Sequence, residues 1–213
     1  MQLNTGEWVV VGICGVLLVG YILGYLTNRQ RAEKIFAWLK QGLSTLGEVS
    51  MGEKLPGMST GGRLEVNQAV PPMKRVETIY LLAPRENLLF WLFHLLQGRG
   101  DELIVWVTYQ SKPEQSIEVA RQGDRQFAKR LLAKDKPAIS LIDSSSKLQV
   151  AAEQKHSSAL LGRVQAFLQQ YPSAIKRLVL RPEKPHLFLR VNLRLMQQKA
   201  AAELFNTLKE LGG

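Results

Sequence analysis

The chain has 213 residues, 28 Lys and Arg against 18 Asp and Glu, and a formal net charge of +10 at neutral pH. This length allows one compact domain or two small ones, and the basic surface favours anionic partners such as lipid headgroups, RNA or acidic proteins. The single cysteine excludes an internal disulfide and a cysteine zinc site, and the three histidines lack the spacing of a metal motif. Because phosphate-binding and nucleophile motifs are also missing, we expect no cofactor, no metal, no small-molecule substrate and no enzymatic activity.

Residues 8–26 form an uncharged apolar stretch, and every Lys and Arg follows it. As a helix this stretch rises about 28 Å, close to the ~30 Å hydrocarbon thickness of a bilayer. No basic residue precedes it, unlike in a cleaved signal peptide. We therefore expect residues 1–28 to comprise a short external N-terminus and a permanent transmembrane helix; a buried core helix is the less favoured alternative.

Basic residues follow the apolar stretch closely and predict its orientation. They are Arg29, Arg31, Lys34 and Lys40. By the positive-inside rule the downstream chain is cytoplasmic and the N-terminus lies outside or in the lumen, in a prokaryotic plasma membrane or a eukaryotic endoplasmic reticulum. The same four side chains are expected to contact anionic lipid.

Three glycines share one face of the predicted transmembrane helix: Gly12, Gly20 and Gly24. Gly20 and Gly24 form a GxxxG pair, which lets a second helix approach closely. The pattern predicts either helix pairing, including a homodimer, or the ordinary tolerance of glycine in membrane helices.

Residues 29–46 have the apolar stripe of an amphipathic helix beside the membrane. This helix could continue the transmembrane helix, lie along the headgroups, or pack onto the downstream domain. Residues 47–74 are rich in Gly, Pro, Ser and Thr, which predicts a flexible linker.

Residues 75–213 are expected to form a cytoplasmic α+β domain that begins with a strand at residues 76–82. A helix, strand, hairpin turn, strand and helix then occur twice, in units at about 85–135 and 157–211 that superpose at an offset of 72 residues. The two predicted hairpins would join in one antiparallel or mixed sheet covered by helices. A further strand is expected at residues 137–143, whereas the apolar residues 148–152 are ambiguous.

The first helix of the duplicated pair carries apolar residues on all sides. Phe90, Trp91 and Phe93 stand where the second copy has Gly162, Arg163 and Gln165. Such a helix needs cover on every side, which the helix at 30–46, the lipid interface, a partner protein or a client segment could supply. This apolar partner surface is the main candidate functional site.

Alternation within the last two predicted strands suggests a basic face on the sheet. Its members would be Arg177, Arg181, Arg190 and Arg194. A solvated strand face explains the same pattern.

Four segments follow one another along the chain: NRQRAEKIFAWLK, RENLLFWLFHLL, SIEVARQGDRQFAKRLL and VQAFLQQYPSAIKRLVL. In this order the chain resembles the calumin family, the coiled-coil-domain subunit of the PAT intramembrane chaperone complex of the endoplasmic reticulum. The resemblance implies a non-enzymatic protein that assists insertion or folding of hydrophobic membrane-protein clients beside translocon or insertase subunits and the ribosome. The sequence differs from that family in lacking an acidic luminal region and a C-terminal coiled coil, so we do not expect calcium binding. A membrane-tethered dimeric scaffold is the alternative function.

Overall fold

The computed structural model describes residues 4–51, 60–124, 127, 139–143, 148–152 and 158–212. Within these residues the chain forms an antiparallel sheet with the strand order β1-β2-β3-β4-β9-β8-β5-β7-β6. The strands are β1 (Ser50–Met51), β2 (Gly61–Val66), β3 (Met73–Leu81), β4 (Glu102–Tyr109), β5 (Ile117–Arg121), β6 (Ile139–Asp143), β7 (Leu148–Ala152), β8 (Ile175–Leu180) and β9 (Leu187–Asn192). The helices are α1 (Thr5–Leu43), α2 (Leu88–Leu96), α4 (Ser158–Gln170), α5 (Leu193–Met196) and α6 (Ala201–Glu210). The predicted α+β class is confirmed.

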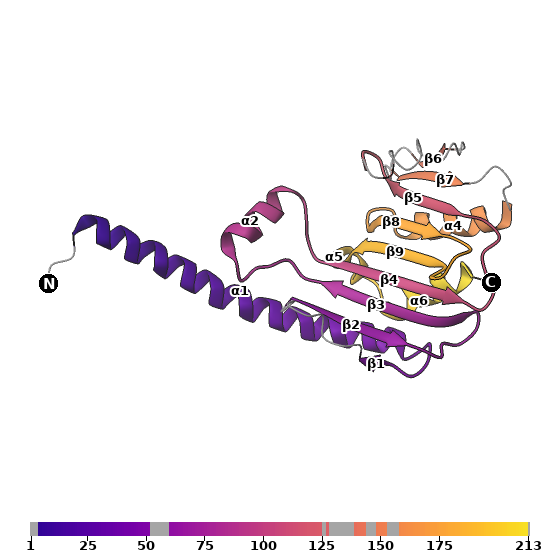
Figure 1. The fold of residues 1–213 in the computed structure, drawn as a ribbon, viewed down its shortest axis with the longest axis horizontal. Helices are drawn as coiled ribbons and strands as arrows, with labels where there is room; N and C mark the ends of the chain where they lie inside the picture. Colours follow the sequence, from indigo (N-terminus) through magenta and orange to yellow (C-terminus); the bar gives the residue numbers. More distant parts are fainter. Residues whose placement is uncertain are drawn as a thin grey trace.

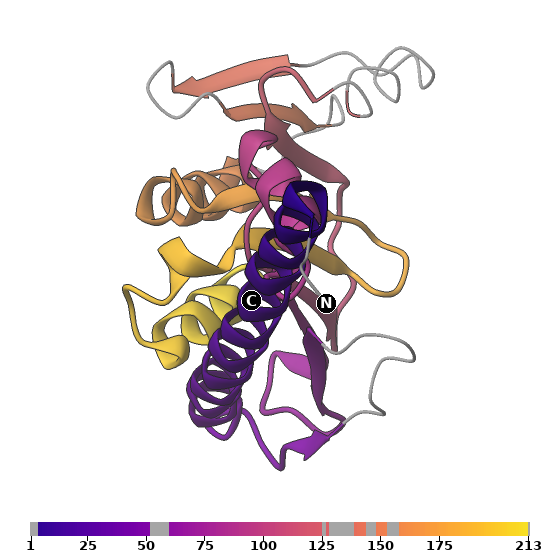
Figure 2. The same ribbon diagram turned by 90° about the vertical axis from the view of Figure 1, so that its left-hand side faces the viewer.

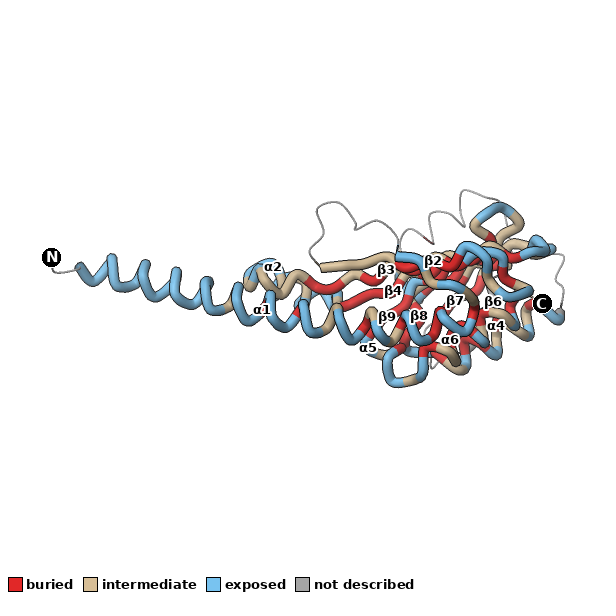
Figure 3. Tube along the Cα trace, turned by 90° about the horizontal axis from the view of Figure 1, so that it is seen from below, coloured by how far each residue is buried: buried red, intermediate tan, exposed pale blue. Residues whose placement is uncertain are grey.

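One face of the sheet is covered by helices, and the core lies between the two layers. The second half of α1 lies on this face together with α4, α5 and α6 (Figures 2 and 3). Burial alternates along the strands, as in β4, where Leu103, Val105 and Val107 are fully buried and Ile104 and Trp106 are not. Since successive side chains of a strand point to opposite faces, this alternation places the core beneath the helices.

The helix α1 is continuous over 39 residues, so the predicted transmembrane and amphipathic segments belong to one element. Its second half packs onto the domain through Ile35, Leu39 and Leu43, and contacts α6 and β2. The Trp38 indole N–H also donates a hydrogen bond of 3.0 Å to the Lys199 carbonyl. The interpretation of residues 29–46 as a separate helix along the headgroups is therefore wrong, because its apolar stripe is needed by the core.

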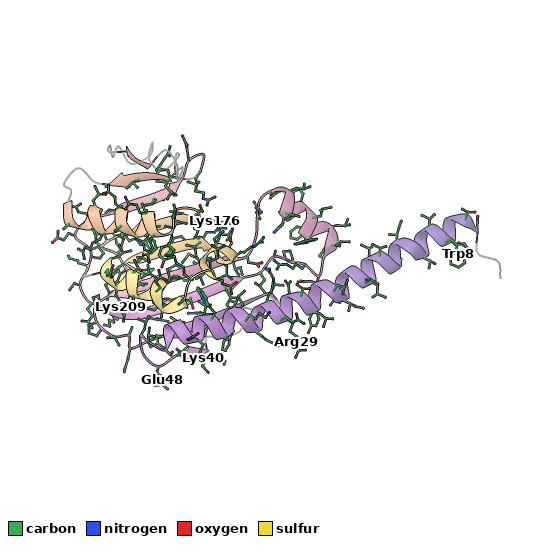
Figure 4. The ribbon with its side chains drawn as sticks, turned by 180° about the vertical axis from the view of Figure 1, so that it is seen from behind. Trp8, Arg29, Lys40, Glu48, Lys176 and Lys209 are labelled. Atoms are coloured by element: carbon green, nitrogen blue, oxygen red, sulfur yellow. The ribbon has the colours of Figure 1, made fainter. Side chains whose placement is uncertain are left out.

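The first half of α1 extends away from the sheet (Figure 1). Its apolar side chains from Trp8 to Tyr21 are exposed, which contradicts the alternative of a buried core helix. Among the described residues, α1 is the one helix long and apolar enough to cross a membrane. Figure 4 shows Trp8 near the free end of this half and Arg29 where α1 reaches the domain.

The segment predicted as a flexible linker contains a strand of the sheet. β2 pairs with β3 along its whole length, from Gly61 opposite Leu81 to Val66 opposite Val76. Gly62 lies under the ring of Tyr80, where a Cβ would come within 2.6 Å of the aromatic carbons. Glycine thus allows close packing against Tyr80 here, and reading it as a linker signal was wrong for residues 61–66. Residues 52–59 of the predicted linker lie outside the described residues.

The strand partners differ from those predicted for the duplicated units. β8 and β9 form the hairpin expected of the second unit, but β4 pairs with β3 and β9, and β5 pairs with β7 and β8. The hairpin of the first unit was therefore wrong, because the second hairpin lies between β4 and β5. The strands expected at 76–82 and 137–143 are confirmed as β3 and β6, and residues 148–152 form β7. Most of the closing helix of the first unit, expected to end near residue 135, falls outside the described residues.

Burial of His186 between the strands predicts a pH dependence of stability. Its Nδ1 accepts a hydrogen bond of 3.0 Å from the Tyr109 backbone N–H, which requires an unprotonated nitrogen. Burial, with a smaller contribution from the Lys184 charge, lowers the histidine pKa from its usual 6.5. The unfolded chain therefore binds the proton more readily, so the free energy of unfolding should be flat above about pH 6.5 and fall below it.

Urea unfolding of the full chain at pH 7.5 and pH 5.5 measures this effect. The variant His186→Gln should lose the difference between the two pH values that the imidazole causes. An equal loss of stability on acidification in both proteins would contradict the assignment.

Candidate functional site

The helix α2 is apolar, but none of its residues belongs to the hydrophobic core. Asn87 caps its first turn by accepting a hydrogen bond of 3.0 Å from the Phe90 backbone N–H, and Gly98, with φ of +66°, follows its last residues. No residue of α2 is buried. We call its exposed apolar side chains the α2 surface: Leu89, Phe90, Leu92, Phe93, Leu95 and Leu96.

Comparison with α4 shows how unusual this exposure is for a helix of this composition. Val164 and Phe167 of α4 are fully buried against the sheet. Leu92 and Leu95, which occupy the matching positions of α2 at an offset of 72 residues, are 48% and 55% exposed. Burying such a side chain is worth about 1.5–3 kcal/mol, so leaving the α2 surface in water would be costly.

The position of α2 shows that residues 30–46, one of the predicted covers of its apolar side chains, do not cover them. Residues 30–46 pack against α6 and β2 and leave the α2 surface exposed, so they do not supply its cover. Instead, α2 lies beside the exposed half of α1, beyond the ends of strands β3 and β4 (Figure 1). Phe90 and Phe93 therefore belong to an exposed apolar surface, as the sequence indicated, whereas Trp91 is only half-exposed.

Gly20 and Gly24 hold the start of α2 against α1. A Cβ at Gly20 would lie 3.4 Å from the Leu88 side chain, and one at Gly24 would overlap the backbone of Arg85 and Glu86. The GxxxG pair thus accommodates a segment of its own chain. A homodimer through these two glycines would need the same space, so no described contact favours the scaffold alternative. Gly12, the third predicted glycine, has no neighbouring atom within 4 Å of a built Cβ.

Two connections, residues 82–87 and 97–101, join α2 to β3 and β4, and we call them the neck. The buried Asp101 is its main polar residue. Its carboxylate accepts a hydrogen bond of 2.9 Å from the Ala83 backbone N–H and ion pairs with both Arg31 and Arg85. Asp101 therefore ties both connections of the neck to α1.

Asn28 adds a second polar link between α1 and the neck, and it is only 4% exposed. Its Nδ2 donates to the Ala83 carbonyl at 3.0 Å and to the Glu86 carboxylate at 2.7 Å, while its Oδ1 accepts from Arg85 at 2.8 Å. These contacts use both the donor and the acceptor of one amide, which fixes its orientation. The network around Asn28 and Asp101 is the structural reason that α2 has a defined place beside α1.

Asn28 and Asp101 were not predicted from the sequence, in which only a weak signal marks them. Asn28 is the last uncharged polar residue before the basic cluster, and Asp101 directly precedes a strand. Single polar residues at such places are common in exposed loops. Their partners lie 55 and 70 residues away, which no local pattern reports.

The four basic residues after the apolar stretch have different surroundings. Arg31 belongs to the network of Asp101. Arg29 makes an exposed pair with Glu33 at 3.4 Å, and Lys34 and Lys40 are exposed. Lys34 and Lys40 are therefore exposed to solvent, Arg29 is exposed in its pair with Glu33, and Arg31 is partly committed to the neck.

The predicted basic face of the sheet is reduced to two of its four members. Arg177 and Arg190 are opposite one another on β8 and β9, but each is paired with a carboxylate, Glu118 at 2.8 Å and Glu102 at 2.6 Å. Arg181 lies beyond the end of β8, and Arg194 lies in α5. The alternation was wrong for these two because both predicted strands end earlier.

A scan against protein-family models and a search of curated proteins each find no match to this chain. Fold and site together define an α+β protein that has, within its described residues, one helix long and apolar enough to cross a membrane and a second, short apolar helix held beside it.

Proposed function

We propose that this is a non-enzymatic, membrane-anchored binding protein that holds transmembrane segments of other proteins against α2 within the cytoplasmic leaflet. Exposure of the α2 surface beside the membrane-crossing half of α1 is the observation that carries this proposal. The resemblance to the calumin family supports the choice of client, namely membrane proteins during insertion or folding near a translocon, insertase or ribosome.

The depth of α2 follows from its contacts with α1. Gly24 and Gly20 lie two and six residues before Leu26, where the apolar stretch ends, or about 3 and 9 Å into the hydrocarbon. α2 has nine residues and is about 13.5 Å long, too short to cross a bilayer. We therefore place it within one leaflet, on the side where Arg29, three residues beyond Leu26, meets the headgroups.

Helix termini normally satisfy their free backbone groups before entering lipid. The Asn87 cap and the polar neck supply such partners, and the neck lies toward the basic cluster. A helix of this kind presents a wide aromatic and aliphatic surface to neighbouring membrane segments, which associate through close packing.

Site-specific photo-cross-linking in native membranes tests this proposal. A photoreactive phenylalanine at position 93 of the full-length protein should form adducts with hydrophobic segments of other membrane proteins. The same residue at position 184, in the exposed connection between β8 and β9, should form no such adducts. Adducts with lipid alone from position 93 would overturn client binding and leave α2 as an anchor.

The double substitution Phe90→Gln and Phe93→Gln should abolish binding with little loss of fold. Neither side chain is buried, so we expect the free energy of unfolding to change by less than about 0.5 kcal/mol. Client adducts, recorded from a photoreactive residue at position 89, should fall to the level of the position 184 control. Unchanged adducts, or unfolding of the sheet domain, would contradict the proposed role of the α2 surface.

A further inference from the structure

A cleft of about 380 Å³ opens at the neck, between α2 and the end of the sheet. Its main lining side chains are Arg31, Arg85, Trp91, Leu95, Arg99 and Arg194. We propose that this neck cleft binds the headgroup of an anionic phospholipid from the leaflet that contains α2. The inference rests on the proposed membrane anchoring, and it adds a lipid site that the client-binding surface does not require.

The charge of the cleft is strongly positive at its polar end. It contains four arginines and one acidic residue, Asp101. Asp101 is buried and its carboxylate is occupied by Arg31 and Arg85. Arg99 and Arg194 are exposed, and within the described parts of the chain their side chains form no ion pair or hydrogen bond. These two guanidinium groups are available to a phosphate, which arginine binds in a planar, two-pronged geometry.

The cleft also has an apolar end, formed by Trp91 and Leu95 of α2. Trp91 suits the boundary between headgroups and hydrocarbon, where its ring can lie in the apolar layer and its N–H in the polar one. A phospholipid has the same sequence of parts, a charged phosphate followed by apolar chains. An RNA or a soluble anion would leave the apolar end without a partner.

The position of the cleft relative to the bilayer agrees with this assignment. Arg31 lies five residues beyond Leu26, which is about 7.5 Å along α1 from the end of the apolar stretch. The headgroup layer on each side of a bilayer is roughly 5–8 Å thick. The phosphates of the leaflet would therefore lie at the level of the arginines, while the acyl chains lie beside α2.

Native mass spectrometry of the full-length protein released from nanodiscs tests the proposal. Nanodiscs of phosphatidylcholine mixed with phosphatidylglycerol should yield the wild-type protein with phosphatidylglycerol retained preferentially. The double variant Arg99→Gln and Arg194→Gln should lose about 30-fold in apparent affinity, since each basic residue near an anionic surface contributes about fivefold. A matched control is the double variant Lys112→Gln and Lys184→Gln. It removes two exposed charges near the ends of β4 and β9 that lie away from the neck, and it should retain the lipid as wild type does.

The outcomes separate the lipid site from the anchor. Equal retention by the arginine variant and wild type, or equal retention of phosphatidylcholine, would overturn the lipid site while insertion into nanodiscs still supports the anchor. Failure of the wild-type protein to enter nanodiscs would overturn both. Displacement of the lipid by millimolar inorganic phosphate would show a site for a soluble anion and would also overturn the proposal.

Discussion

The substitution Asp101→Ala is expected to lower the free energy of unfolding by about 3 kcal/mol. It removes the carboxylate that pairs with Arg31 and Arg85 and accepts from the Ala83 backbone N–H. Arg31 is partly exposed and can recover hydration, so its share of the loss is small. Arg85 is only 16% exposed, and with the Ala83 N–H it would be left without its partner, which accounts for most of the effect.

Chemical unfolding of the full chain in a mild detergent measures this loss, with the near-ultraviolet circular dichroism of the sheet domain as the signal. The control Glu33→Ala removes an ion pair whose two side chains are both about two-thirds exposed. It should change stability by less than about 0.5 kcal/mol. If Asp101→Ala cost no more than this control, the network would not be what positions the neck.

The substitution Gly24→Leu is expected to displace α2 from α1 and to cost about 3 kcal/mol. A side chain at this position would overlap the backbone of Arg85 and Glu86, and a backbone segment cannot move aside as the end of a flexible side chain can. Arg85 also belongs to the Asp101 network, so moving it weakens those contacts as well.

An engineered disulfide reports the displacement directly. A Cβ built at Gly20 lies 3.6 Å from the Leu88 Cβ, within the range that disulfides require. The pair Gly20→Cys and Leu88→Cys, combined with Cys14→Ser, should therefore cross-link on oxidation. Adding Gly24→Leu should prevent the cross-link, whereas adding Gly12→Leu should not, because Gly12 has open space around it. Cross-linking that persists with Gly24→Leu would show that α2 is held by other contacts.

Patterns within a single element predicted much of the fold. The length of the apolar stretch, the strand expected at 76–82 and the last helix of the second unit depend on neighbouring residues, and the structure has them as the first half of α1, β3 and α6. The linker prediction failed at β2 because Gly61 and Gly62 resemble a flexible segment, whereas both pair with β3 and Gly62 lies in close contact with Tyr80. The first hairpin failed because strand pairing joins segments far apart in sequence, such as Trp106 with Phe188.

The candidate site was predictable only in part. The sequence identified Phe90, Trp91 and Phe93 as surplus apolar residues but could not decide what covers them. It also identified the close-packing pair Gly20 and Gly24 without showing that their partners are Leu88 of α2 and the neck of the same chain.

The sequence by itself determined an apolar stretch of membrane-spanning length, a basic cluster after it, an α+β domain and a second helix with apolar side chains on every face. These are properties of composition and local periodicity. Only the tertiary structure decided that this second helix lies beside the first, at the level of Gly20 and Gly24, and that Asn28 and Asp101 hold it there. Those decisions depend on contacts between residues more than fifty positions apart, which form only when the whole chain has folded.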